Sequence, residues 1–82
     1  MQIHRVVSAR AIDNHTLLVE FDNAGKRQYD ITPLLSKDAF APLKDPDLFK
    51  AVRVEQGGYA VIWNSEIDLS EYELWRNGQP MP

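Results

Sequence analysis

Apolar and polar residues alternate most regularly in residues 16–21, TLLVEF. Leu17, Val19 and Phe21 fall on one side of an extended chain there, which is the period-two pattern of a strand with one buried face. The segments before and after it also alternate, and residues that favour turns separate the three segments. We therefore predict an antiparallel meander with strands near residues 4–12, 16–22 and 26–31.

Two details of the meander follow from the same pattern. In the first strand, Val7, Ala9 and Ala11 fall on one face, which we expect to be the buried one. In the turn of residues 22–25, Gly25 is the residue available for a left-handed backbone conformation.

Three short helices are predicted from their start signals. Thr32 and Asp45 each stand directly before a proline, so each can cap a helix whose first residue is that proline. Ser70 and Glu73 have the spacing of a capping box. The helices are expected near residues 33–36, 46–51 and 71–76.

A second hairpin is predicted between the last two helices. Residues 52–55 and 59–63 alternate, and Gln56-Gly57-Gly58 between them suits a tight turn. With the meander, this hairpin indicates the α+β class: a small curved antiparallel β-sheet with short helices. A chain of 82 residues is expected to form a single domain, residues 1–82. The large apolar residues on the inner faces are expected to form its core: Leu17, Val19, Phe21, Ile31, Leu35, Leu48, Phe49, Val61, Trp63 and Leu74.

The short length makes stability a concern, because such a chain buries only about 60–65% of its unfolded surface. No cysteine is present to form a disulfide or a thiolate zinc site, so a homodimer is one remedy that stays open. Arg5 and Arg10 interrupt any signal-peptide-like apolar run, and no segment has the length of a membrane span. We expect a cytoplasmic protein without membrane partners.

Charge is distributed unevenly along the chain. The net charge is −3, and residues 54–75 hold five acidic side chains and no basic one. This segment is either a surface that binds another protein or a solvated edge whose acids cap a helix. On the first interpretation, the candidate partner-binding residues are the acids and aromatics towards its end: Glu66, Asp68, Glu71, Tyr72, Glu73 and Trp75.

Single residues of this segment allow two interpretations as well. The carboxylate of Asp68 could orient an arginine of a partner, or it could accept backbone N–H groups at a strand end. Trp63 and Trp75 are more typical of a core than of a contact surface in so small a domain.

No catalytic group, cofactor or metal site is predicted. The four glycines form no phosphate-binding loop, and a cysteine nucleophile is absent. His4 and His15 would lie at opposite ends of the first hairpin, so they are not expected to share a metal. Nucleic-acid binding is also disfavoured: Lys26-Arg27, with Arg5 or Arg10 across the meander, forms one basic cluster, but the sequence pI is about 5.2.

The order of several segments resembles a family of small bacterial proteins known as domain of unknown function 2442. The resemblance covers residues 3–76 and rests on segments such as Leu18-Val19-Glu20-Phe21-Asp22, Asp45-Pro46-Asp47-Leu48-Phe49 and Ala60-Val61-Ile62-Trp63. It implies an α+β fold with a curved antiparallel sheet and no established activity. Some members continue into a helix-turn-helix domain, for which this chain has no room, and others stand beside a second small protein in a suspected toxin–antitoxin pair.

These observations favour a protein-interaction module, such as the antitoxin-like or regulatory partner of a small basic toxin-like protein. Two alternatives stay open, a weak nucleic-acid-binding regulator and a small-ligand-binding domain without catalysis.

Overall fold

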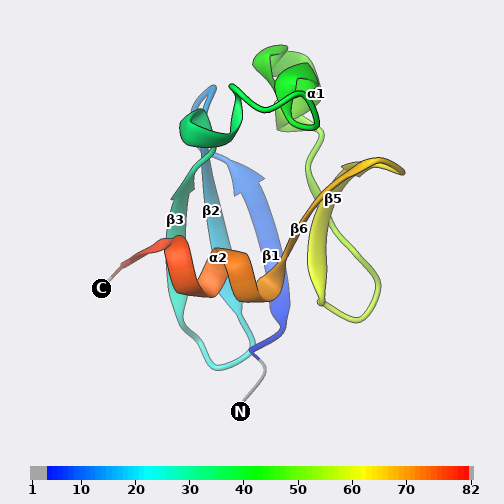
Figure 1. The fold of residues 1–82 in the computed structure, drawn as a ribbon. Helices are drawn as coiled ribbons and strands as arrows, with labels where there is room; N and C mark the ends of the chain where they lie inside the picture. Colours follow the sequence, from blue (N-terminus) through cyan, green and yellow to red (C-terminus); the bar gives the residue numbers. More distant parts are fainter. Residues whose placement is uncertain (1–3, 82) are drawn as a thin grey trace.

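The computed structural model describes residues 4–81 and confirms the α+β class (Figure 1). The meander and the second hairpin both form, but they belong to two antiparallel sheets, with strand orders β1-β2-β3-β7 and β4-β5-β6. The strands are β1 (Val6–Ala11), β2 (Thr16–Phe21), β3 (Lys26–Asp30), β4 (Arg53–Val54), β5 (Ala60–Asn64), β6 (Ile67–Ser70) and β7 (Gln79–Pro80). The helices are the 3₁₀ turns η1 (Thr32–Leu34) and η2 (Ala41–Lys44) and the α-helices α1 (Pro46–Lys50) and α2 (Glu71–Asn77).

Helix α2 links the two sheets. It follows β6 directly, crosses one face of the meander and leads into β7 (Figure 1). There β7 pairs with β3, with Gln79 opposite Gln28 and Pro80 opposite Arg27. The sheets also meet directly, because β1 lies against β4 and β5. Neither β6 nor β7 was predicted as a strand, because they have only four and two residues.

Two of the three predicted helix caps are confirmed. A side-chain oxygen of Asp45 accepts the backbone N–H of the second residue of α1 at 3.0 Å. Ser70 Oγ accepts the backbone N–H of Glu73 at 3.1 Å. Thr32 does not cap a helix, because it lies within η1 and its own N–H donates to Asp30 Oδ1 at 2.9 Å. The aspartate at the end of β3 therefore supplies the acceptor that starts this turn.

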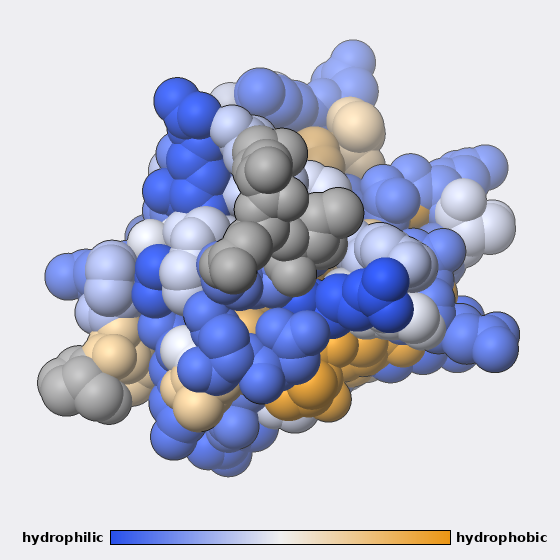
Figure 2. Space-filling model, turned by 90° about the horizontal axis from the view of Figure 1, so that it is seen from below, coloured by the Kyte–Doolittle hydropathy of each residue, from blue (hydrophilic) through white to orange (hydrophobic). Residues whose placement is uncertain are grey.

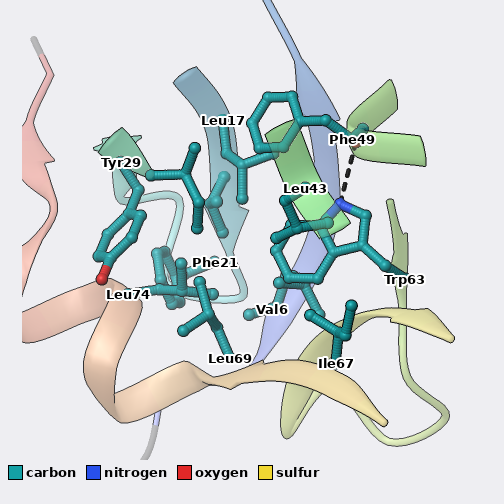
Figure 3. Close-up of a cluster of buried hydrophobic side chains, with 13 residues drawn as sticks. Val6, Leu17, Phe21, Tyr29, Leu43, Phe49, Trp63, Ile67, Leu69 and Leu74 are labelled. Atoms are coloured by element: carbon teal, nitrogen blue, oxygen red, sulfur yellow. Dashed lines mark hydrogen bonds between the residues drawn. The ribbon is translucent and has the colours of Figure 1, made fainter. Parts of the chain in front are cut away.

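Side chains from both sheets and both α-helices meet in one hydrophobic core (Figure 3). The prediction was wrong for Leu35 and Leu48, which are only partly buried. Leu35 follows the three-residue turn η1 as its C-cap, and Leu48 is displaced by about 100° around α1 from its buried neighbour Phe49. The other predicted core residues are buried: Leu17, Val19, Phe21, Ile31, Phe49, Val61, Trp63 and Leu74.

Six buried residues were missing from the predicted core, among them Tyr29 of β3 and Ala60 of β5. Val6 opens β1, Leu43 comes from η2, and Ile67 and Leu69 form the inner face of β6. Ile67 and Leu69 flank Asp68, the one acidic residue of this short strand, so the core extends directly beneath the charged segment.

A β-bulge between Val6 and Ser8 changes which residues of β1 face the core. It turns Val7 outward, where 58% of its surface is exposed, so the prediction that Val7 lies on the buried face was wrong. Ala9 and Ala11 do pack against the core. The bulge shifts the register by one residue, and such a shift moves a side chain to the opposite face.

The turn between β2 and β3 corrects the role predicted for Gly25. The left-handed residue is Ala24, with a φ of 66°, and not the glycine. Gly25 is needed for a different reason, because a Cβ atom there would lie 2.8 Å from Cζ3 of the Trp75 ring. The glycine therefore lets the indole of α2 approach the backbone of the turn closely.

Ala24→Gly is expected to stabilise the protein by about 0.5–1 kcal/mol. Left-handed backbone costs an alanine about 1–2 kcal/mol, which exceeds the additional unfolded-state entropy of a glycine. Urea denaturation followed by circular dichroism measures the change. Gly25→Ala is the matched control and should destabilise, because its methyl group meets the Trp75 ring. A stabilising Gly25→Ala, or a destabilising Ala24→Gly, would contradict this description of the turn.

Trp63, the first of the two tryptophans, lies in the core. Its side chain is buried and stacks on the ring of Phe49 at a centroid distance of 6.1 Å. The indole N–H donates to the backbone oxygen of Phe49 at 2.9 Å (Figure 3). This bond satisfies the one polar group of the side chain, so Trp63 is a core residue that joins β5 to α1.

Candidate partner-binding surface

The six candidate residues follow one another from the β5–β6 turn through β6 into α2. Glu66 lies in that turn and is exposed. The side-chain oxygen of Asn64 accepts the backbone N–H groups of Glu66 at 2.8 Å and of Ile67 at 3.0 Å. The turn is therefore held by an asparagine, and the Glu66 carboxylate takes no part in holding it.

Asp68 lies on the outer face of β6 and is exposed. It stands opposite Ile62 of β5, which in turn stands opposite Arg53 of β4. Within residues 4–81, the Asp68 carboxylate accepts no hydrogen bond and joins no ion pair. The interpretation in which Asp68 accepts backbone N–H groups at a strand end is therefore wrong, and its charge stays directed at solvent.

Glu73 is part of the fold, in contrast to Asp68. The Tyr29 hydroxyl donates to Glu73 Oε2 at 2.7 Å, and the Asn77 side-chain amide donates to the same oxygen at 2.9 Å. The capping box is therefore only half formed, because Ser70 caps the helix while the Glu73 carboxylate turns to β3. Burial, together with the nearby Glu73 carboxylate, raises the pKa of Tyr29 well above its ordinary value, so Tyr29 remains a hydrogen-bond donor.

Trp75 also supports the packing of α2 on the meander. The guanidinium of Arg27 lies over its ring at 3.7 Å from the centroid, and Arg27 Nε donates to the Trp75 carbonyl oxygen at 3.1 Å. Phe21 meets the indole edge-on with a centroid distance of 5.0 Å, and the His4 ring lies at 4.3 Å. These contacts come from β2, from β3 and from the residue two positions before β1, and they leave Trp75 half-buried.

The remaining aromatic candidate, Tyr72, is 47% exposed on α2. Its hydroxyl accepts a hydrogen bond from Arg76 at 2.6 Å, one helical turn further on. Tyr59 is also exposed and lies near the start of the same helix, because the backbone N–H of Glu71 donates to the backbone carbonyl oxygen of Tyr59 at 2.8 Å. We give the name acidic edge to four of the candidates: exposed Glu66, Asp68 and Tyr72, and half-buried Glu71.

The predicted basic cluster is largely engaged within the fold. The Arg27 guanidinium lies over Trp75, and that of Arg5 lies over the Tyr59 ring at 4.6 Å from its centroid. Two of the four basic residues that could have met a phosphate backbone are therefore occupied by aromatic rings. This reduces the support for the nucleic-acid alternative.

The two histidines have separate local partners. His15 Nδ1 lies 3.4 Å from Asp30 Oδ1 and 3.6 Å from Asp13 Oδ1. The His15 backbone N–H lowers the pKa of Asp13, and hydrogen bonds from Thr32 lower the pKa of Asp30. His4 instead contacts Trp75 at the other end of the hairpin. In the part of the chain that the structure describes, no three His, Asp or Glu side chains are grouped to hold a metal ion.

The surface seen from below is mostly hydrophilic, with one hydrophobic patch (Figure 2). Four large hydrophobic side chains are exposed among residues 4–81: Val7, Ile12, Tyr59 and Tyr72. This surface therefore presents mainly charged and hydrogen-bonding groups, with little broad apolar area. None of the helices in the described range is long and apolar enough to cross a membrane.

The fold defines an α+β domain of two small antiparallel sheets with short helices. The chain belongs to the family described as protein of unknown function (DUF2442), whose sequence profile matches residues 6–80. This confirms the resemblance inferred from the order of the segments. Comparison with curated proteins and comparison with solved structures each gave no significant match.

Proposed function

We propose that this chain is a protein-interaction module that binds a basic partner through the acidic edge. The observation that carries the proposal is the position of Asp68. Its carboxylate is exposed on a short strand above the core, and no described residue neutralises it or bonds to it. A charge that contributes nothing to the fold is available for a partner, and arginine is the side chain that matches a carboxylate best.

The neighbouring residues support the same proposal. Residues 54–75 contain five acidic side chains and no basic one, and Arg76, which donates to the Tyr72 hydroxyl, is the one basic residue beside the acidic edge in the sequence. Tyr72 adds an exposed aromatic ring beside the charges. Aromatic rings supply contact area, and complementary charge speeds association. The partner class that we favour is a small basic protein, as in a toxin–antitoxin-like or regulatory pair.

Glu66→Lys combined with Glu71→Lys is expected to slow association with the partner about tenfold or more at low salt. The salt dependence of the rate should also become flatter, because less charge is left to screen. The partner is first recovered by co-purification from the native host, and stopped-flow kinetics at low and moderate salt then give the rates. Folding should change by no more than about 1–2 kcal/mol, mainly through the lost interaction of Glu71 with the start of α2.

Asp22→Lys combined with Asp38→Lys is the matched control. It changes the net charge by the same amount at exposed positions outside the acidic edge. The control should leave the association rate within about twofold to threefold of the parent rate if steering is local. Equal slowing by both pairs would mean that only net charge matters, and unchanged rates in the Glu66 and Glu71 variant would refute the proposed function.

A further inference from the structure

Strand β6 is an unpaired edge of the second sheet. It pairs with β5 on one side, and no strand within residues 4–81 pairs with it on the other. The other outer strands of the two sheets are protected. β1 and β4 lie against each other, and β7 is a two-residue strand that contains Pro80. Proline and very short strands are common means of protecting an edge, and β6 contains neither a proline nor a lysine.

The register identifies the backbone groups that this edge exposes. In an antiparallel pair, residues that exchange hydrogen bonds alternate with residues whose N–H and C=O groups point away from each other. The hydrogen bond from the backbone N–H of Glu71 to the backbone carbonyl oxygen of Tyr59 identifies these two residues as an exchanging pair. Asp68, opposite Ile62, therefore belongs to a non-exchanging pair, and both of its backbone groups point away from β5. The N–H of Ser70 points the same way by the same alternation.

The side chains around these groups define what could pair with them. An added strand would place every second side chain on the outer face of the sheet, beside Asp68 and Ser70, with exposed Glu66 in the turn before them. The alternate side chains would face the side of Ile67 and Leu69, which are buried. A segment that alternates basic and apolar residues matches both faces.

We propose that an extended basic segment of the partner adds to β6 as a fourth strand of the second sheet. The proposal rests on the proposed function and deepens it, because it assigns the way in which the acidic edge binds. Backbone hydrogen bonds to Asp68 and Ser70 provide the attachment, and the carboxylates of the acidic edge select basic side chains. Strand addition of this kind is a common mode of peptide recognition.

A synthetic peptide, acetyl-Lys-Val-Arg-Val-Lys-Val-amide, is the probe for this binding. The matched control is the same peptide with N-methyl groups on alternate residues, in both possible phases, which keeps the charge and removes backbone donors along one edge at a time. Isothermal titration calorimetry at low salt compares the dissociation constants. One methylated phase is expected to bind about tenfold more weakly than the parent peptide, because it loses its backbone bonds to β6, and the other about equally well.

Amide hydrogen exchange gives a second measurement that needs no variant protein. The amides of Asp68 and Ser70 should exchange at least about tenfold more slowly when the parent peptide is bound, because unpaired edge amides become bonded. On the protein side, Asp68→Pro removes the edge N–H and should weaken the peptide more than Asp68→Asn, which removes only the charge. Circular dichroism checks that both variants fold. If the proline variant does not fold, the hydrogen-exchange measurement on the parent protein decides whether the peptide pairs with β6.

The outcomes separate this proposal from the proposed function. If both methylated phases bind as well as the parent and the Asp68 amide is unprotected, strand addition is refuted, while charge-dependent binding still supports the acidic edge. If neither parent nor methylated peptide binds, strand addition by a basic segment is refuted, and the association kinetics of the Glu66 and Glu71 variant decide the proposed function independently.

Discussion

Replacing Phe49 with alanine is expected to destabilise the protein by about 3–5 kcal/mol, because a fully buried ring is lost and a cavity remains. Phe49 has no exposed surface and stacks on Trp63. It is the only fully buried side chain of the short helix α1, so its removal takes away the main apolar contact between that helix and the core. Domains of this kind have a total stability of about 5–15 kcal/mol, so the variant should lose between about a fifth of it and nearly all of it.

Thermal and urea denaturation followed by circular dichroism measure this effect. For a domain of this length, 1 kcal/mol corresponds to about 4–8 °C in Tm, so the midpoint should fall by more than about 10 °C. Leu48→Ala is the control on the same helix. Leu48 is only partly buried, and we expect about 1–2 kcal/mol from its smaller buried area. A Tm shift of one or two degrees for Phe49→Ala would show that α1 is peripheral.

Gly58→Ala is expected to destabilise the protein by about 2–4 kcal/mol, combining left-handed strain with overpacking. Gly58 has a φ of 77°, and an added Cβ would lie 2.5 Å from the backbone oxygen of Val6. The same glycine accepts the Val6 N–H at 2.8 Å, so the hairpin of the second sheet meets β1 of the first sheet at this point. The methyl group cannot fit without separating the two sheets there.

Gly57→Ala isolates the contribution of the contact between the sheets. Gly57 is also left-handed, with a φ of 92°, but its added Cβ would meet the exposed ring of Tyr59, which can move aside. This variant should lose only the strain, about 1 kcal/mol after the entropy change of the unfolded chain. Urea denaturation of both variants gives the difference. Equal losses would show that the approach of Gly58 to β1 contributes nothing to stability.

The parts of the fold that could be predicted are those set by neighbouring residues. The alternation of Leu17, Val19 and Phe21 fixes β2, and side-chain oxygens at Asp45 and Ser70 fix the starts of the two α-helices. These signals act over a few residues, so they can be read from the sequence without knowing the rest of the fold.

The parts that could not be predicted depend on contacts between distant segments. Whether the second hairpin joins the meander's sheet depends on how β1 meets β4, and alternation carries no information about that. Gly25 appeared to be a turn residue, but its requirement comes from Trp75, about fifty residues away. In this turn the alanine, and not the neighbouring glycine, takes the left-handed conformation, and the sequence alone does not indicate this.

The candidate site was predictable as a segment but not residue by residue. Acidic composition located the segment of residues 54–75, yet it could not separate Glu73, which bonds to Tyr29, from Asp68, which bonds to nothing described. The roles of these two acids differ because α2 packs on β3, which brings Glu73 to Tyr29. The unpaired edge of β6 also escaped prediction, because the strand itself has only four residues.

The different surroundings of the two tryptophans make the protein its own optical reporter. Trp63 lies in the dry core beside a carbonyl group, while Trp75 lies partly exposed beneath a guanidinium, so their fluorescence should differ in emission maximum and in quenching. A protein that keeps only Trp63 follows the dissolution of the core, and one that keeps only Trp75 follows the release of α2 from the meander. Comparing the two would reveal whether the last helix opens locally before the whole molecule unfolds.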